Sequence, residues 1–220
     1  MKNRTLLVLA LMAANDRWGQ PAVLRTVLVK QAFLAETIRP LYGVWLRTFG
    51  FVRYHYGPWS AEIFKRLDTL ICNGLVEVIK AEQRGGKMEA HYRITHAGHR
   101  VLAQFADSDL VPLATDLVWA LQTLGVEQAT TICKLVYEEA EFARLFAEHQ
   151  AAGIGAETQV PLPAVTAANN ETFTTLAILQ ALMRRGKDLP ALAPRDVVRI
   201  FLKSLAAQLP SANAAKGAAA

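Results

Sequence analysis

The chain has 220 residues, of which 52% are hydrophobic and 20% are charged, and its formal net charge is +5. These proportions are typical of a globular protein and exclude an intrinsically disordered chain. A chain of this length buries enough apolar surface to fold as one large domain or two small ones, without a disulfide or a metal ion.

The positive charge is concentrated in the first half of the chain. Residues 1–107 contain 15 Lys and Arg against 8 Asp and Glu, whereas residues 108–220 contain 9 against 11. A basic excess confined to one half indicates that this half binds a polyanion, of which DNA is the usual example.

The first segment has two features of a secretory signal, because Lys2 and Arg4 precede an apolar run over residues 6–14. The run is short and continues into polar residues, so we predict an ordinary buried helix. No other stretch approaches the roughly 20 apolar residues of a membrane span. Cys72 and Cys133 each fall within an apolar helical pattern, which favours buried thiols over a disulfide or a redox pair. The sequence therefore predicts a cytoplasmic protein without a membrane partner.

Two helices and an aromatic strand are predicted over the first 59 residues. The helix over residues 6–14 is closed by Gly19, and Pro21 is suited to the first turn of the next helix. Apolar residues continue at helical spacing to residue 35, and Pro40 and Gly43 end that helix. Residues 49–59 are aromatic and favour a strand that Gly57 and the following proline interrupt.

A third helix and a two-stranded wing follow. Ser60 can cap a helix over residues 60–73, and Gly74 can end it. Its apolar stripe consists of Ile63, Phe64, Leu67, Leu70 and Ile71. Residues 75–79 and 91–94 alternate as strands around a loop at 82–88, and Thr95 can cap one more helix. This order predicts a mainly α fold with a small β-wing (α+β), namely an N-terminal winged helix-turn-helix over residues 1–107.

The second half is predicted to be helical. Helical periodicity covers residues 110–124, 127–149, 171–185 and 194–209, and a loop or linker is predicted between 153 and 170. The apolar faces of these helices favour a core, or else a surface for dimerisation or for a partner protein. We therefore divide the chain into a winged-helix domain (1–107), a helical dimerisation or partner-binding region (108–209) and a flexible tail (210–220).

Several short motifs resemble the YwgA-type family of uncharacterised bacterial proteins. They are the segment from Phe51 to Ser60 (Phe-Val-Arg-Tyr-His-Tyr-Gly-Pro-Trp-Ser), the triplet Gly74-Leu-Val76, and the segment from Tyr92 to Gly98 (Tyr-Arg-Ile-Thr-His-Ala-Gly). A more distant similarity is to the Panacea antitoxin domain, which shares a Tyr-Gly-Pro element before a helix. The resemblance covers about residues 6–105 and implies a winged-helix fold in a bacterial or phage-linked setting. It implies no catalytic residue.

Two groups of residues are candidates for binding. The first is a DNA-binding set on the third helix and the wing tip, consisting of Lys65, Arg66, Thr69, Asn73, Arg84 and Lys87. The alternative for these residues is a solvated charged surface, to which Glu62 and Asp68 would also belong. The second is a partner-binding set in the aromatic segment, consisting of Arg53, His55 and Trp59. Core and turn packing is the alternative for that segment.

Catalytic and metal-binding signatures are not found in the sequence. His91, His96 and His99 lack the paired spacing of a zinc site, and phosphate-binding glycine loops and nucleophile motifs are missing. We therefore expect neither an enzyme nor a cofactor. The leading hypothesis is a winged-helix DNA-binding protein acting as a bacterial transcriptional regulator, with double-stranded DNA as its partner. The rival is a non-enzymatic protein-binding subunit, antitoxin-like or accessory, of a bacterial antiviral defence or prophage-linked system.

Overall fold

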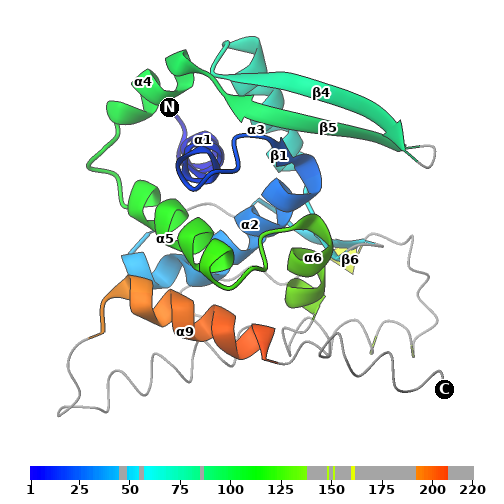
Figure 1. The fold of residues 1–220 in the computed structure, drawn as a ribbon, viewed down its shortest axis with the longest axis vertical. Coiled ribbons are helices and arrows are strands. Elements are labelled where there is room, and N and C mark those ends of the chain that lie inside the picture. Colours follow the sequence, from blue (N-terminus) through cyan, green and yellow to red (C-terminus); the bar gives the residue numbers. More distant parts are fainter. Residues whose placement is uncertain are drawn as a thin grey trace.

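The computed structural model describes residues 1–44, 49–54, 57–84, 87–137, 148, 151, 160–161 and 192–207. These residues form a mainly helical protein with small antiparallel sheets (Figure 1). The mainly α fold with a small β part is therefore confirmed. In the described part of the chain, no helix is both long enough and apolar enough to cross a membrane.

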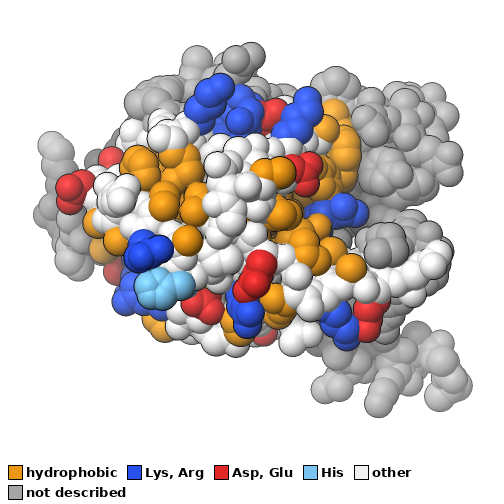
Figure 2. Space-filling model, turned by 90° about the horizontal axis from the view of Figure 1, so that it is seen from above, with side chains coloured by type: hydrophobic (Ala, Val, Ile, Leu, Met, Phe, Trp, Pro, Cys, Tyr) orange, Lys and Arg blue, Asp and Glu red, His pale blue; other side chains and the backbone are white. Residues whose placement is uncertain are grey.

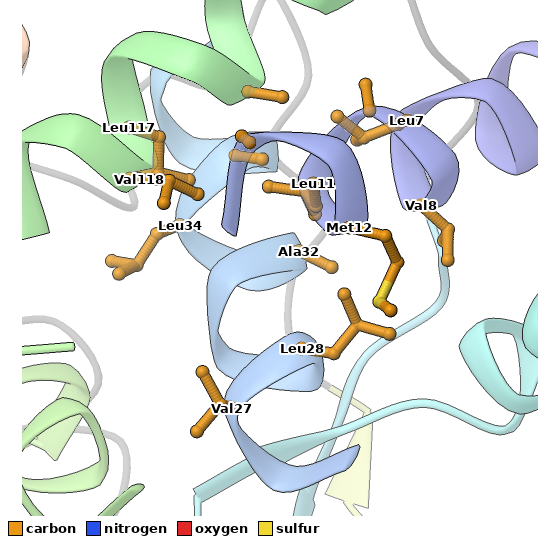
Figure 3. Close-up of a cluster of buried hydrophobic side chains, with 14 of the residues drawn as sticks. Leu7, Val8, Leu11, Met12, Val27, Leu28, Ala32, Leu34, Leu117 and Val118 are labelled. Atoms are coloured by element: carbon orange, nitrogen blue, oxygen red, sulfur yellow. The ribbon is translucent and has the colours of Figure 1, made fainter. Parts of the chain in front are cut away.

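Helix α1 (Asn3–Arg17) lies at the centre of the molecule. Every residue from Thr5 to Asn15 is buried, because α2, α3, α4, α5 and β5 all contact this helix. Figure 3 shows Leu11 of α1, Leu34 of α2 (Arg25–Ile38) and Val118 of α5 (Leu110–Thr123) in one apolar cluster. The segment expected to be an ordinary buried helix is therefore enclosed by elements from both halves of the chain.

The second helix begins later than its sequence pattern predicted. Pro21 is not in its first turn, because Val23 and Leu24 form a short strand, β1, before α2 begins at Arg25. Val23 pairs with Tyr92 and Leu24 with His91, so this dipeptide is the edge strand of a three-stranded sheet. The 3-10 helix η1 (Arg39–Tyr42) follows α2 and ends at Gly43, whose φ of 64° is left-handed.

The aromatic segment forms two strands where one was predicted. Strands β2 (Val52–Tyr54) and β3 (Gly57–Trp59) are antiparallel, with Val52 opposite Trp59. Strand β6 (Val160–Pro161) pairs with the other edge of β2, so part of the predicted loop at 153–170 joins this sheet. The prediction of a single interrupted strand was wrong, because the Gly-Pro pair lies within a paired strand of a hairpin.

The third helix and the hairpin after it form near the positions that the sequence predicted. Ser60 caps α3 (Ala61–Cys72) by accepting a hydrogen bond from the Glu62 N–H. Of the predicted stripe, Ile63, Leu67 and Leu70 are buried. Strands β4 (Val76–Arg84) and β5 (Lys87–Ile94) extend into the segment predicted as a loop, and the sheet order is β1-β5-β4. Thr95 caps α4 (His96–Ala103) as predicted.

The second half packs directly on the first. Helix α5 contacts α1, α6 (Ala129–Tyr137) contacts α2, and α9 (Pro194–Ala206) contacts α5. One apolar core therefore includes residues from both sides of residue 107. Leu113, Leu117 and Leu121 are buried in it as expected, whereas Ile200 of α9 is 38% exposed. The predicted helix at 171–185 and the tail at 210–220 lie outside the described residues, as do residues 138–147 and 149 of the predicted helix at 127–149.

The two cysteines do not behave alike. Cys72 is exposed in the last turn of α3, on the side away from Leu67 and Leu70, so the prediction of a buried thiol was wrong for this residue. Cys133 on α6 is half-buried. Both thiols are free.

Candidate functional site

The outer face of α3 gathers half of the predicted DNA-binding residues. Lys65, Thr69 and Asn73 are all exposed and follow one another at four-residue spacing, which places them along one side of the helix. The Thr69 hydroxyl donates to the Lys65 carbonyl at 2.7 Å, and the Asn73 amide donates to the Thr69 carbonyl at 2.6 Å. The same side carries the exposed Asp68 and Cys72, so the face is polar and close to neutral.

Arg66 differs from the other predicted residues of α3. Its Nε donates to Oε1 of Glu62 at 2.8 Å, and Nη2 of Arg4 lies 3.0 Å from the same oxygen. Each of these three side chains is about one-fifth exposed. The hydrogen bond from Arg66, assisted by the charge of Arg4, holds the pKa of the Glu62 carboxyl below its usual range. Arg66 therefore lies at the edge of α3 in an ion pair, rather than outward as predicted.

The β4–β5 hairpin projects from the body of the protein beside α3 (Figure 1). Arg84 and Lys87 are opposite one another at its end, and their side chains lie outside the described part. Nearer the body, Lys80 is 2.7 Å from Glu82, and Arg93 is 2.7 Å from Glu77. The cations at the base of the hairpin are therefore matched by acids, as the alternative of a solvated surface predicts.

The upper face of the molecule shows the same mixture of charges. In Figure 2 the Lys and Arg side chains are dispersed among acidic and apolar ones rather than joined in one basic patch. The basic excess of the first half is therefore not concentrated on this face.

Two apolar side chains of β4 are exposed at a bulge, Val78 at 46% and Ile79 at 40%.

The predicted partner-binding set is only partly described. Arg53 lies on β2 with its side chain outside the described part, and His55 is outside it altogether. Trp59 is half-buried and stacks at 5.5 Å on Phe64 of α3. The guanidinium of Arg25, which the sequence pattern did not single out, lies 4.7 Å from the centre of the Phe64 ring. The side chains of Trp59 from β3 and Arg25 from α2 therefore both pack on the Phe64 ring of α3.

A buried polar network that sequence reasoning missed positions α3. The Lys30 ammonium donates to the Pro58 carbonyl at 2.8 Å, and the Phe49 N–H donates to Glu36 at 2.5 Å. The Ser60 hydroxyl in turn donates to the Phe49 carbonyl at 2.5 Å. These bonds tie both ends of the segment before α3 to α2. The only signal in the sequence was a pair of charged residues inside an otherwise apolar helical pattern.

Burial shifts the titration of both charged groups in this network. It lowers the pKa of the Lys30 ammonium to about 8, which the nearby Cys133 opposes. It raises the pKa of the Glu36 carboxyl to about 7, although the Phe49 N–H, Arg39 and Arg4 favour the ionised form. Desolvation therefore outweighs hydrogen bonding and charge at both positions.

No family model matches this chain, and no curated protein matches it. Among the described residues, no three His, Cys, Asp or Glu side chains lie together in a way that could hold a metal ion. Of the three histidines considered above, His99 has its Nε2 2.9 Å from Asp16 and so joins α4 to α1. The described candidate residues that lie together are therefore those on the polar face of α3, beside the β4–β5 hairpin.

Proposed function

We propose that this protein is a winged-helix DNA-binding protein that acts without catalysis. The observation that carries the proposal is the order α1, β1, α2, α3, β4, β5, with η1 and the β2–β3 hairpin inserted between α2 and α3. The sheet order is β1-β5-β4, and the polar face of α3 beside this sheet is exposed. In helix-turn-helix proteins a helix in this position enters the major groove, and a neighbouring hairpin can contact the DNA backbone or the minor groove. The resemblance to the YwgA-type family is in keeping with this fold.

The chemistry of the α3 face suits base edges. Lys65 can donate to guanine and Asn73 to adenine, while the carboxylate of Asp68 can accept from cytosine. From Lys65 to Asn73 the helix rises by about 12 Å, which spans only three or four base pairs. A single copy would therefore select a short sequence.

A short recognition face favours a dimer that reads two half-sites. We propose that residues 108–209 supply the dimer contact or dock a partner, as expected for a transcriptional regulator. Light scattering of the full chain tests this: a mass of two chains supports the dimer, and a mass of one chain removes it.

DNA binding is tested by fluorescence anisotropy on a mixed double-stranded DNA at several salt concentrations. The full chain should bind, and its affinity should fall steeply as salt rises. Lys65→Glu should abolish binding, whereas Lys203→Glu, the same charge change at an exposed position of α9, should have little effect. Normal binding by Lys65→Glu would remove α3 as the contact surface, and no binding by the full chain would reject the proposal.

A second candidate is favoured by the exposed apolar pair on β4. Val78 and Ile79 lie at the edge of the wing sheet, where unpaired strand edges and apolar side chains are available to another protein. This supports a protein-binding subunit, antitoxin-like or accessory, in a defence or prophage-linked system. Purification from the native cell tests it: a partner that Val78→Ser with Ile79→Ser releases would support this function, and a partner retained by that variant would remove β4 as its site.

A further inference from the structure

Three side chains from two helices meet at the start of α3. Arg4 comes from the first turn of α1, and Glu62 and Arg66 come from successive turns of α3. Both guanidinium groups contact the same oxygen, Oε1 of Glu62, and the Arg66 contact uses Nη2 as well as Nε. Lys65 adds a third positive charge that acts on this carboxyl. Two guanidinium groups from different helices therefore converge on one carboxylate oxygen, with the Lys65 ammonium close enough to act on the same group.

The arrangement resembles the way proteins hold a phosphate. Two guanidinium groups that converge on one oxygen match the geometry of an oxyanion, and arginine binds carboxylate and phosphate with the same donors. The amide groups in the first turn of α3 add a partial positive charge at the same place. The site also borders the exposed face that carries Lys65 and Thr69, on which the DNA backbone would lie.

We propose that Arg4 and Arg66 form a binding site for a backbone phosphate of DNA, and that the Glu62 carboxylate occupies this site in the free protein. The inference rests on the proposed function. A phosphate that enters must displace the carboxylate, so Glu62 weakens binding to every DNA sequence by a similar factor. The base contacts of α3 then decide whether a complex persists, because backbone contacts carry little sequence information.

The test is Glu62→Gln, which removes the charge and keeps the shape of the side chain. Ser60 still caps α3 in this variant, because its hydroxyl accepts from the backbone N–H of residue 62. Removing the carboxylate should steepen the dependence of log affinity on log salt by about 0.9 for each guanidinium that then contacts a phosphate, and the affinity at low salt should rise on the order of tenfold. The gain should be equal on related and unrelated DNA sequences.

The matched control is Asp196→Asn. It also removes one negative charge from beside an arginine, because Asp196 lies 3.8 Å from Arg199 on the distant helix α9. This variant should leave the salt dependence unchanged. A second control adds Arg4→Gln and Arg66→Gln to Glu62→Gln, and the gain should then disappear.

Each outcome decides between the inference and the proposed function. A wild-type protein that binds DNA, with the same salt dependence in Glu62→Gln, overturns the phosphate site and leaves DNA binding intact. Failure of both proteins to bind DNA overturns both. Binding by Glu62→Gln alone supports the site. Glu62→Ala should show the same gain in DNA affinity. It replaces Glu62→Gln in the test if that variant is unstable, because alanine has a high helix propensity.

Discussion

The side chains of Asn15 and Gln31 exchange two hydrogen bonds inside the core, where neither is exposed to solvent. The Asn15 amide donates to Gln31 Oε1 at 2.8 Å, and the Gln31 amide donates to Asn15 Oδ1 at 3.0 Å. Asn15 also donates to the Leu11 carbonyl at 2.7 Å. The surrounding side chains of α1 and α2 are mainly apolar. The amide pair adds a directional contact that favours one register of the two helices.

We expect Asn15→Leu to destabilise the protein by about 1–3 kcal/mol, because it leaves the buried carboxamide of Gln31 without its partner. Asn15→Leu with Gln31→Met should recover a large part of this loss, since both polar groups are then removed. Urea denaturation of the two single variants and the double variant measures the coupling. Losses that simply add would show that the two side chains act independently.

Gly98 illustrates a residue whose importance depends on close packing. A Cβ atom at this position of α4 would lie 2.3 Å from the Leu75 carbonyl oxygen and 2.6 Å from Ile94 Cγ1. Gly98→Ala should therefore lower stability by about 1–3 kcal/mol, although alanine favours helices. His96→Ala, an exposed change in the same helix, is the control and should shift the urea midpoint very little. A stabilised Gly98→Ala protein would contradict this packing.

Helix α3 and the β4–β5 hairpin were predictable because local chemistry specifies them. Ser60, Gly74 and Thr95 act on their own backbone neighbourhood, and the stripe through Leu67 follows from helical periodicity alone. The Thr-x-x-Gly pattern that ends at Gly98 was also visible in the sequence, but the Leu75 carbonyl that requires glycine there comes from before β4. The sequence therefore predicted a glycine near the start of this helix, but it did not show which contacts exclude a larger side chain.

Pairing over long distances in the chain was not predictable. β1 is only a dipeptide, and it is a strand because β5, nearly 70 residues later, offers it an edge. Arg66 was expected to face outward because helical spacing alone does not show that its side chain pairs with Glu62, or that Arg4 of α1 contacts the same carboxylate. Lys30 and Glu36 were likewise hidden in an apolar pattern. Such groups depend on tertiary burial, which periodicity along a single helix does not report.

The buried carboxyl of Glu36 should make stability depend on pH. Burial raises its pKa from the ordinary 4.5 to about 7, so between these values the folded protein keeps a proton that the unfolded chain has released. The contribution of Glu36 to the free energy of unfolding should therefore be largest below pH 4.5. It should fall by about 1.4 kcal/mol per pH unit between pH 4.5 and 7. Lys30 acts in a different window, because its lowered pKa makes stability rise above pH 8.

Glu36→Gln should remove this dependence while keeping a carbonyl oxygen for the Phe49 N–H. Urea denaturation at pH 5, 6 and 7 compares it with the wild type and with Asp109→Asn, an exposed change at the start of α5. A wild-type slope that Glu36→Gln leaves intact would assign the titration to another group.

The exposed thiol of Cys72 should report on DNA contact. A maleimide should modify Cys72 before Cys133, because Cys133 is half-buried and burial raises the pKa of its thiol. The bulky adduct would lie beside Asn73 on the face of α3 and should abolish DNA binding. Mass spectrometry gives the site and anisotropy the affinity, with maleimide-treated Cys72→Ser as the control. Full binding by protein labelled only at Cys72 would place DNA elsewhere.

The shared core makes the first half of the chain dependent on the second. Leu7 and Leu11 of α1 belong to the same apolar cluster as Leu117 of α5 (Figure 3), and α1 contacts α5. A fragment of residues 1–107 would expose this side of α1, which is buried on all faces in the full chain. We expect the fragment to aggregate or to unfold without a cooperative transition.

Supplying residues 108–220 in trans should restore solubility to that fragment, because α5 can again cover α1. Circular dichroism melting and light scattering of the fragment, the mixture and the full chain make the comparison. A matched control is the full chain with Leu117→Asp, which should show the same exposure of α1 without any truncation. If the fragment instead melts cooperatively as a monomer, residues 1–107 are a self-sufficient domain, and α5 covers a surface that can tolerate solvent.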